Sequence, residues 1–293
     1  MKTREWVAFI AMTSIWGSSY LWIKLAVREI GPFALVGLRL LLGAIVLAVI
    51  VAARRPSFPQ KAQLWRGLLF MGLVHNALPF VLVSWSEKVV DSAIASVLIS
   101  TVPLFTLILS HFLLRDERIT PGRVMGLLVG FGGVVVLMSR EVDGSLKQDE
   151  LLGYVALLAA SLSYALGGVF ARRNLSQVET TVQAFVPVVV ADLLAWAGAW
   201  TAEGSSILPT LPLTWISVLW LGVMGSGFVY ILYFRLLHSV GPVRLSTGAY
   251  VIALIGVVLG VIFLGERLDW QLAAGGGLVI AGVLIVNTRS QGR

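Results

Sequence analysis

Two charged side chains lie deep inside apolar stretches of the chain, where each could act on a small molecule. Arg39 stands in "GLRLLL" and Asp192 stands in "VVADLLAW". A charge in such surroundings is costly unless it is paired or reaches water. Arg39 could therefore anchor a substrate carboxylate, or it could be a structural arginine bonded to backbone carbonyl groups. Asp192 could bind a substrate amine or carry a proton, but we expect it to pair with Arg39.

A histidine, an amide and a proline interrupt another apolar stretch, "LVHNALPFV". His75 titrates near neutral pH and could carry a coupling proton. With Asn76 it could also contact a substrate. The alternative is a neutral histidine whose hydrogen bonds are satisfied by a neighbouring helix.

Hydroxyl groups and aromatic rings complete the set of candidate binding residues. Hydroxyl groups inside apolar helices can bind a substrate or simply join two helices. The faces of aromatic rings can hold an apolar group or a cation. The predicted substrate contacts of these two kinds are Trp16, Ser100, Thr101, Tyr164, Tyr230 and Tyr250.

Prolines and glycines mark the places where apolar segments could bend. Pro79 and Pro103 lie within two segments of the first half, and Gly225 and Gly227 lie within a segment of the second half. Proline removes a backbone donor, and glycine weakens a helix. We therefore predict hinges at these four residues.

The sequence motifs of enzymes are missing from this chain. It has no HExxH motif, no G-x-S-x-G motif and no Walker motif, and "GLLVGFGG" lacks the lysine of a nucleotide-binding loop. Cysteine is absent, so thiolate metal sites and cysteine nucleophiles are excluded. We expect a protein that is not an enzyme and that needs neither a metal ion nor another cofactor.

The composition indicates that a membrane positions these side chains. Of the 293 residues, 58% are hydrophobic and only 13% are charged, whereas soluble domains carry about 25% charged residues. A spanning helix needs about 20 mostly apolar residues. Ten segments satisfy this requirement: 6–26, 32–53, 64–86, 91–114, 121–139, 151–171, 179–201, 213–237, 242–264 and 270–288.

The distribution of positive charge predicts the orientation of these segments. If the N-terminus is cytoplasmic, most lysines and arginines fall in the connections on the cytoplasmic side. We therefore expect both termini in the cytoplasm and a location in a bacterial-type inner membrane. The same distribution accounts for the net charge of +7 without a nucleic-acid partner.

A short charged motif occurs twice, about half the chain apart. "LLRDERITPG" contains Glu117-Arg118, and "FLGERLDWQL" contains Glu266-Arg267. Each half of the chain contains five segments, and an odd number turns the second half upside down in the membrane. We predict an all-α membrane protein with ten transmembrane helices in two inverted repeats, 1–145 and 146–293. The motifs themselves are expected to cap helix ends.

Glycines with small-xxx-small spacing predict how the last segment of each half packs. They are Gly126, Gly130 and Gly133 in the fifth segment and Gly275, Gly276, Gly277 and Gly282 in the tenth segment.

Four stretches resemble the drug/metabolite transporter superfamily in its EamA-type branch. They are "SIWGSSYLWIK", Pro32 followed by "LRLLLGA", "RDERITPGRVMG" and "LGERLDWQLAAG". The overall pattern is similar to the YddG-type aromatic amino-acid exporters. The resemblance implies two inverted five-helix repeats, alternating access around a central cavity and efflux of a small metabolite.

We therefore expect a monomeric secondary exporter of amino acids, with aromatic or apolar ones first. An exporter of cationic drugs is one alternative, although the first segment has no glutamate between Trp6 and Lys24. A membrane module that binds or senses a ligand without moving it is another alternative. In each case the expected partners of the protein are a small molecule and the lipid bilayer.

Overall fold

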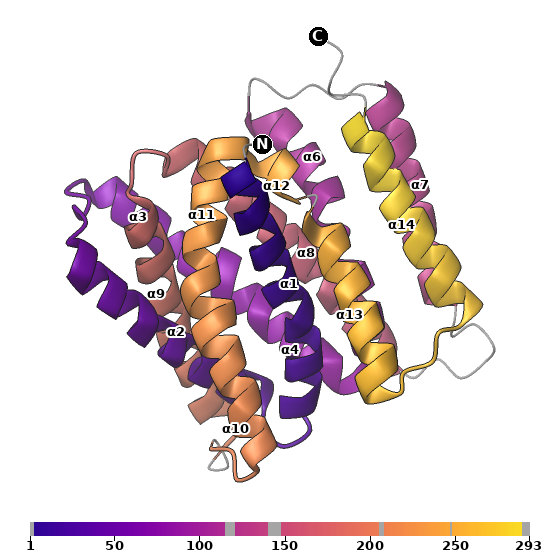
Figure 1. Cartoon of the computed structure of the whole chain (residues 1–293), viewed down its shortest axis with the longest axis horizontal. Helices are drawn as coiled ribbons and strands as arrows, with labels where there is room; N and C mark the ends of the chain where they lie inside the picture. Colours follow the sequence, from indigo (N-terminus) through magenta and orange to yellow (C-terminus); the bar gives the residue numbers. More distant parts are fainter. Residues whose placement is uncertain (1–2, 115–120, 140–147, 205–207, 247, 289–293) are drawn as a thin grey trace.

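The computed structural model describes residues 3–114, 121–139, 148–204, 208–246 and 248–288, and every regular element in these ranges is a helix (Figure 1). The elements are α1 (Thr3–Ala26), α2 (Pro32–Arg54), α3 (Ala62–Met71), η1 (Gly72–Ala77), α4 (Leu78–Val89), α5 (Ser92–Ile99), α6 (Val102–Leu113), α7 (Pro121–Met138), α8 (Gln148–Asn174), α9 (Thr180–Ala202), α10 (Pro212–Leu219), η3 (Trp220–Phe228), α11 (Val229–Val240), α12 (Pro242–Ser246), α13 (Gly248–Leu264) and α14 (Trp270–Thr288). The segments named η are π-helical.

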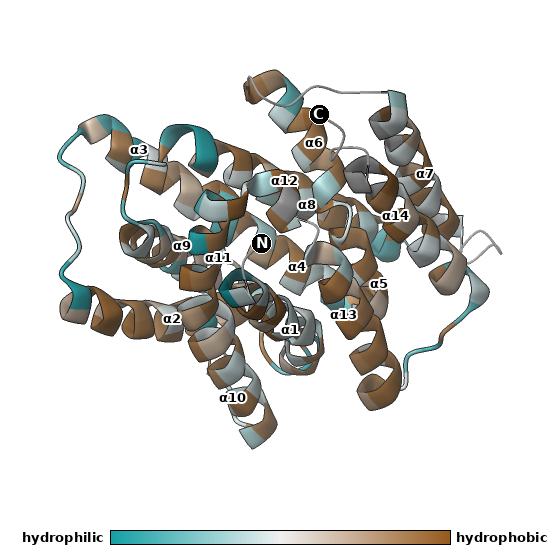
Figure 2. Ribbon diagram, turned by 45° about the horizontal axis from the view of Figure 1, so that its top comes forward, coloured by the Kyte–Doolittle hydropathy of each residue, from teal (hydrophilic) through white to brown (hydrophobic). Residues whose placement is uncertain are grey.

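Seven helical segments within the described ranges are long and apolar enough to cross a membrane. They are Thr3–Ala26, Pro32–Arg54, Ala62–Val89, Ser92–Leu113, Gln148–Asn174, Thr180–Ala202 and Pro212–Val240. Shorter apolar helices, Val124–Leu137, Gly248–Leu264 and Trp270–Gly282, fall where the fifth, ninth and tenth spans were predicted. Large apolar side chains such as Phe112 and Trp200 are about three-quarters exposed, and hydrophobic residues recur along many of the helices (Figure 2). Lipid would cover such a surface.

Two of the predicted spans contain π-helical turns near their middle. Segment η1 ends just before Pro79, which lies in the first turn of α4. A proline ring cannot accept the regular helix geometry of the preceding turn, so the wider π turn absorbs the mismatch. Segment η3 contains Gly222, Gly225 and Gly227, which allow close packing against α2.

The predicted span 91–114 is broken in its middle. The hydroxyl groups of Ser100 and Thr101 donate to the carbonyl oxygens of Val97 and Leu98, at 2.6 and 2.7 Å. Pro103, in the first turn of α6, supplies no backbone N–H. The helix therefore stops at Ile99 and restarts at Val102, although the sequence suggested one continuous span.

The predicted packing of α7 against α14 is confirmed, and the two helices stand side by side at one edge of the molecule (Figure 1). A Cβ atom added at Gly133 would lie 2.5 Å from the carbonyl oxygen of Gly275, and one at Gly282 would overlap the backbone of Gly126 and Gly130. Glycine is needed at these positions because the two backbones touch.

Carboxylates cap the first turns of three helices from distant parts of the chain. Glu266 accepts hydrogen bonds from the backbone N–H and hydroxyl of Ser92 and from the N–H of Ala93, all at 2.8 Å. This confirms the expected capping role of the second Glu-Arg motif. The first motif, Glu117-Arg118, lies outside the described residues.

The other two caps follow the same pattern. Glu203 accepts from the N–H groups of Phe33 and Ala34 at the start of α2. Glu29 accepts from Thr210 and from the N–H of Leu211 just before α10. All three carboxylates join one half of the chain to the other half.

Candidate functional site

A cavity of about 140 Å³ lies among α1, α2, η1, α4, α5, α6, α8, α11, α12 and α13. Its lining is mostly apolar and aromatic. Five of the predicted contacts contribute to this lining: Trp16, Arg39, His75, Tyr164 and Tyr230. These residues are distant in the sequence, so helix packing alone brings them together.

Arg39 is the buried charge of this cavity, with only 3% of its surface exposed. Its Nε donates to the hydroxyl of Ser226 in η3 at 3.2 Å. The guanidinium carbon lies 4.1 Å from the centre of the Phe80 ring, a cation–π contact. The arginine is therefore held in place by one neutral hydrogen bond and one aromatic ring.

The predicted pairing of Arg39 with Asp192 is wrong. The described residues that bind the Arg39 side chain are Ser226 and Phe80, and Asp192 is not part of the cavity lining. One oxygen of the Asp192 carboxylate is buried and has no hydrogen-bond partner among the described residues. Arg39 and Asp192 both lie within apolar stretches, but Arg39 on α2 lines the cavity and Asp192 on α9 does not.

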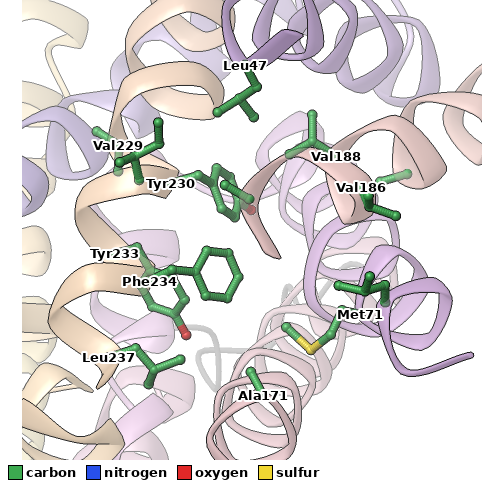
Figure 3. Close-up of a cluster of buried hydrophobic side chains, with 14 of the residues drawn as sticks. Leu47, Met71, Ala171, Val186, Val188, Val229, Tyr230, Tyr233, Phe234 and Leu237 are labelled. Carbon is green, nitrogen blue, oxygen red and sulfur yellow. The ribbon is translucent and has the colours of Figure 1, made fainter. Parts of the chain in front are cut away.

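Aromatic rings form a continuous wall beside Arg39. Trp16 lies 5.4 Å from Tyr233 between ring centres, and its indole N–H donates to the carbonyl oxygen of Gly225 at 3.0 Å. His75 stacks on Tyr233 at 5.2 Å. Tyr230, Tyr233 and Phe234 all project from α11 (Figure 3). The π segment thus positions both Trp16 and Arg39, through Gly225 and Ser226.

Four other predicted contacts do not line the cavity. Asn76 lies behind the wall, where its side-chain oxygen accepts from the hydroxyl of Tyr230 at 2.9 Å. Ser100 and Thr101 use their hydroxyls within the break between α5 and α6. Tyr250 packs with Leu104, Leu107 and Phe131. These four side chains are not part of the cavity lining in this structure, so their contact with a substrate stays a prediction.

Several cavity residues were missed by the sequence analysis. Tyr20 and Tyr233 are buried aromatic residues of the lining, together with Phe80. Tyr20 is four residues after Trp16, and Tyr233 is three residues after Tyr230. That spacing places each pair on one face of a helix, which is the signal that could have found them.

Comparison with known proteins identifies related transporters. The model of the EamA-like transporter family matches residues 4–139 and matches again over residues 151–288. The uncharacterized transporter YoaV of Bacillus subtilis is 24% identical, over 95% of each chain. The uncharacterized inner membrane transporter YedA of Escherichia coli is 30% identical, over 95% of this chain and 89% of its own.

A further relative of Escherichia coli, named as a probable amino-acid metabolite efflux pump, is 24% identical over 97% of this chain and 95% of its own. A protein of known crystal structure superposes with a TM-score of 0.71, covering 98% of this chain and 97% of its own at 22% identity. That likeness concerns the fold alone.

Proposed function

Because the chain belongs to the EamA-like transporter family of the drug/metabolite transporter superfamily, and so is a multi-pass membrane transporter, we propose that it exports small amphiphilic metabolites. Amino acids with aromatic or apolar side chains are the first candidates. The observation that carries this proposal is a buried arginine in a cavity walled by aromatic rings.

The chemistry of Arg39 supports an anionic group on the substrate. A guanidinium has five N–H donors, and the described residues offer it one acceptor, the Ser226 hydroxyl. The remaining donors can bind a carboxylate in a bidentate manner, which is the strong geometry for this pair. The rings of Trp16 and Tyr233 can then contact an apolar or aromatic side chain.

We further propose ten membrane-spanning segments in two inverted repeats, 1–145 and 146–293, with both termini in the cytoplasm. Three observations support this arrangement. The family model matches each half separately, π-helical turns interrupt the third and eighth segments alike, and α2 packs on α9 while α7 packs on α14. The Escherichia coli relative YedA, an uncharacterized inner membrane transporter, supports an inner-membrane location.

Alternating access would expose the cavity to each side of the membrane in turn. Pro79, Pro103, Gly225 and Gly227 lie at or beside the irregular turns of the third, fourth and eighth segments. We propose that these turns are the hinges. In this scheme the third, fourth, eighth and ninth segments move against the rest.

Counterflow in proteoliposomes tests the proposed function and the role of Arg39. We expect radiolabelled phenylalanine to exchange with unlabelled amino acid through the wild-type protein. Arg39→Gln should weaken this exchange about tenfold or more, because a hydrogen bond to a charged group contributes about 1.5–3 kcal/mol. Arg39→Lys keeps the positive charge, so this variant should lose less of the phenylalanine exchange than Arg39→Gln.

Phenylalanine methyl ester, which lacks the carboxylate, is the matched control substrate. Equal effects of Arg39→Gln on both compounds would show that the arginine is structural. Binding without any exchange in the wild-type protein would favour a ligand-sensing module. Preferential exchange of an apolar cation would favour the drug exporter.

A further inference from the structure

Glu87 is a fully buried carboxyl group outside the cavity. It lies in the last turn of α4, and 0% of its surface is exposed. Both of its carboxyl oxygens are buried, and neither has a hydrogen-bond partner among the described residues. An ionised carboxylate in this position would have lost its hydration without replacement, which is strongly unfavourable.

The nearest cation does not compensate for this loss by direct contact. The ammonium group of Lys24, on α1, donates instead to the main-chain oxygens of Glu87 and Val90, at 2.7 Å each. Lys24 thereby closes the C-terminal end of α4, where unpaired carbonyl groups attract cations. Among the described residues, none donates a hydrogen bond of normal geometry to the Glu87 carboxyl oxygens.

The other elements around α4 bring few ionisable groups to this place. Glu266 follows α13 and caps α5, while Arg39 on α2 and Tyr20 on α1 line the cavity. The charges of Glu266, Arg39 and Lys24 act on Glu87, Tyr20 lies within reach of its charge, and the buried Tyr154 follows Gly153 on α8. Helix α5 has no titratable side chain, and α8 approaches the end of α4 through Gly153.

We propose that Glu87 is a proton-binding site that couples proton movement to transport. In the conformation described here the carboxyl group carries its proton and is sealed from water. Opening of this end of the bundle, which breaks the Glu266 cap on α5, would hydrate Glu87 and let the proton leave to water. The step is a simple acid dissociation, so it needs no further reactant.

This inference rests on the proposed transport function, but the site can be tested separately from it. Infrared spectra of the purified protein at neutral pH report the carbonyl stretch of carboxyl groups that stay protonated there, because exposed carboxylates are ionised at this pH. We expect a band in the wild-type spectrum that is missing in Glu87→Gln. An exposed acid on α8, Asp149, gives the control variant Asp149→Asn, which should keep the band.

Transport of radiolabelled phenylalanine provides the functional test. Glutamine has the shape of a neutral glutamic acid, so Glu87→Gln should fold and should keep counterflow at equal pH. Accumulation of phenylalanine driven by a pH gradient should be lost. Asp149→Asn should keep both activities.

Several results would overturn the proposal. One is an unchanged infrared band in Glu87→Gln, and another is gradient-driven accumulation equal to that of the wild type. Accumulation that survives in Glu87→Gln but is lost in His75→Gln would assign the proton to His75. If the wild type exchanges no phenylalanine, the proposed function fails for this substrate, while the infrared comparison still decides whether Glu87 binds a proton.

Discussion

At the scale of single residues, the wall of the cavity depends on one buried hydrogen bond. The hydroxyl of Tyr230 donates to the side-chain oxygen of Asn76, and both residues are about 1% exposed. Water cannot take the place of the Tyr230 hydroxyl, because the Asn76 side-chain oxygen is enclosed by protein. The bond therefore holds α11 against η1 behind the ring of Tyr230.

Replacing Tyr230 with phenylalanine removes this bond and leaves the Asn76 oxygen unsatisfied. We expect the free energy of unfolding to fall by about 1–3 kcal/mol, seen as a lower unfolding temperature in detergent. Tyr233→Phe is the matched control, since the Tyr233 hydroxyl has no hydrogen bond with a described residue and its ring stays in place. Equal unfolding temperatures for the two variants would contradict the structural role of the Tyr230–Asn76 bond.

The sequence could reveal some site residues and not others for a physical reason. Arg39, His75 and Trp16 are polar or amphipathic groups in long apolar segments. The free-energy cost of placing such groups there is enough to identify them as candidate site residues. Ser100 and Thr101 lie within the break between α5 and α6, and Asn76 lies within η1, where regular helical spacing no longer tells which side chains face the cavity. Glu87 was missed because it adjoins Lys88 at a segment end, where an acid usually meets water.

At the scale of helices, the contact of α7 with α14 is made by backbone atoms. Gly133 faces the carbonyl oxygen of Gly275, whereas a Cβ at the neighbouring Gly132 would meet nothing within 4 Å. A methyl group at residue 133 must therefore push the two helices apart. The same group at residue 132 points away from the contact.

We expect Gly133→Ala to destabilise the protein by about 1–3 kcal/mol, the usual cost of overfilling a packed interface. Gly132→Ala should be neutral or slightly stabilising, because alanine favours helix over glycine by about 1 kcal/mol. Unfolding temperatures of both variants in one detergent give the comparison. A stable Gly133→Ala would mean that the two helices can separate freely.

The Glu29 cap at the start of α10 predicts a pH dependence. Hydrogen bonds from Thr214 and from the N–H of Thr210 hold the pKa of Glu29 at about 2, below its ordinary value of 4.5. Because the pKa is lowered in the folded protein, the ionised cap stabilises the fold at pH values above the ordinary pKa of a glutamate. The stabilisation is lost as the pH falls from 4.5 towards 2.

Unfolding of the wild type and of Glu29→Gln at several pH values checks this expectation. The difference in unfolding temperature should be constant from about pH 8 to about pH 5 and should shrink below pH 4.5. A difference that changes near pH 6 or 7 would show that Glu29 titrates there. Changes in transport between pH 5 and 8 are therefore expected to come from other groups.

At the scale of the whole molecule, composition was sufficient to predict a helical membrane protein. Apolar segments of about 20 residues can satisfy their backbone groups only as helices, so the positions of most helices followed from the sequence. The breaks within those segments did not follow, since they depend on side-chain bonds such as those of Ser100 and Thr101. The cavity forms where such irregular segments meet regular helices.

The opening proposed at the Glu266 cap separates the start of the fourth segment from the end of the ninth, and joining these two segments tests it. A Cβ at Gly260 would lie 2.9 Å from the hydroxyl of Ser92 and closer still to the Glu266 carboxylate, so cysteines at residues 92 and 260 can form a disulfide once that carboxylate moves aside. The natural chain has no cysteine, which leaves this pair free of competing thiols. We expect the oxidised Ser92→Cys/Gly260→Cys protein to lose phenylalanine exchange and to regain it when reduced.

A second pair of cysteines separates the effect of locking from the effect of substitution. Leu137→Cys with Gly275→Cys joins α7 to α14, where a Cβ at residue 275 would touch the Leu137 side chain and lie 2.9 Å from the carbonyl oxygen of Gly133. The reduced form carries the same packing cost, so it is the reference for the oxidised form. These two helices are expected to stay together throughout the cycle, so the oxidised control should exchange phenylalanine as well as its reduced form. Full activity of the oxidised 92–260 pair would rule out relative motion of the fourth and ninth segments at this end, and access to the cavity would then have to open elsewhere in the bundle.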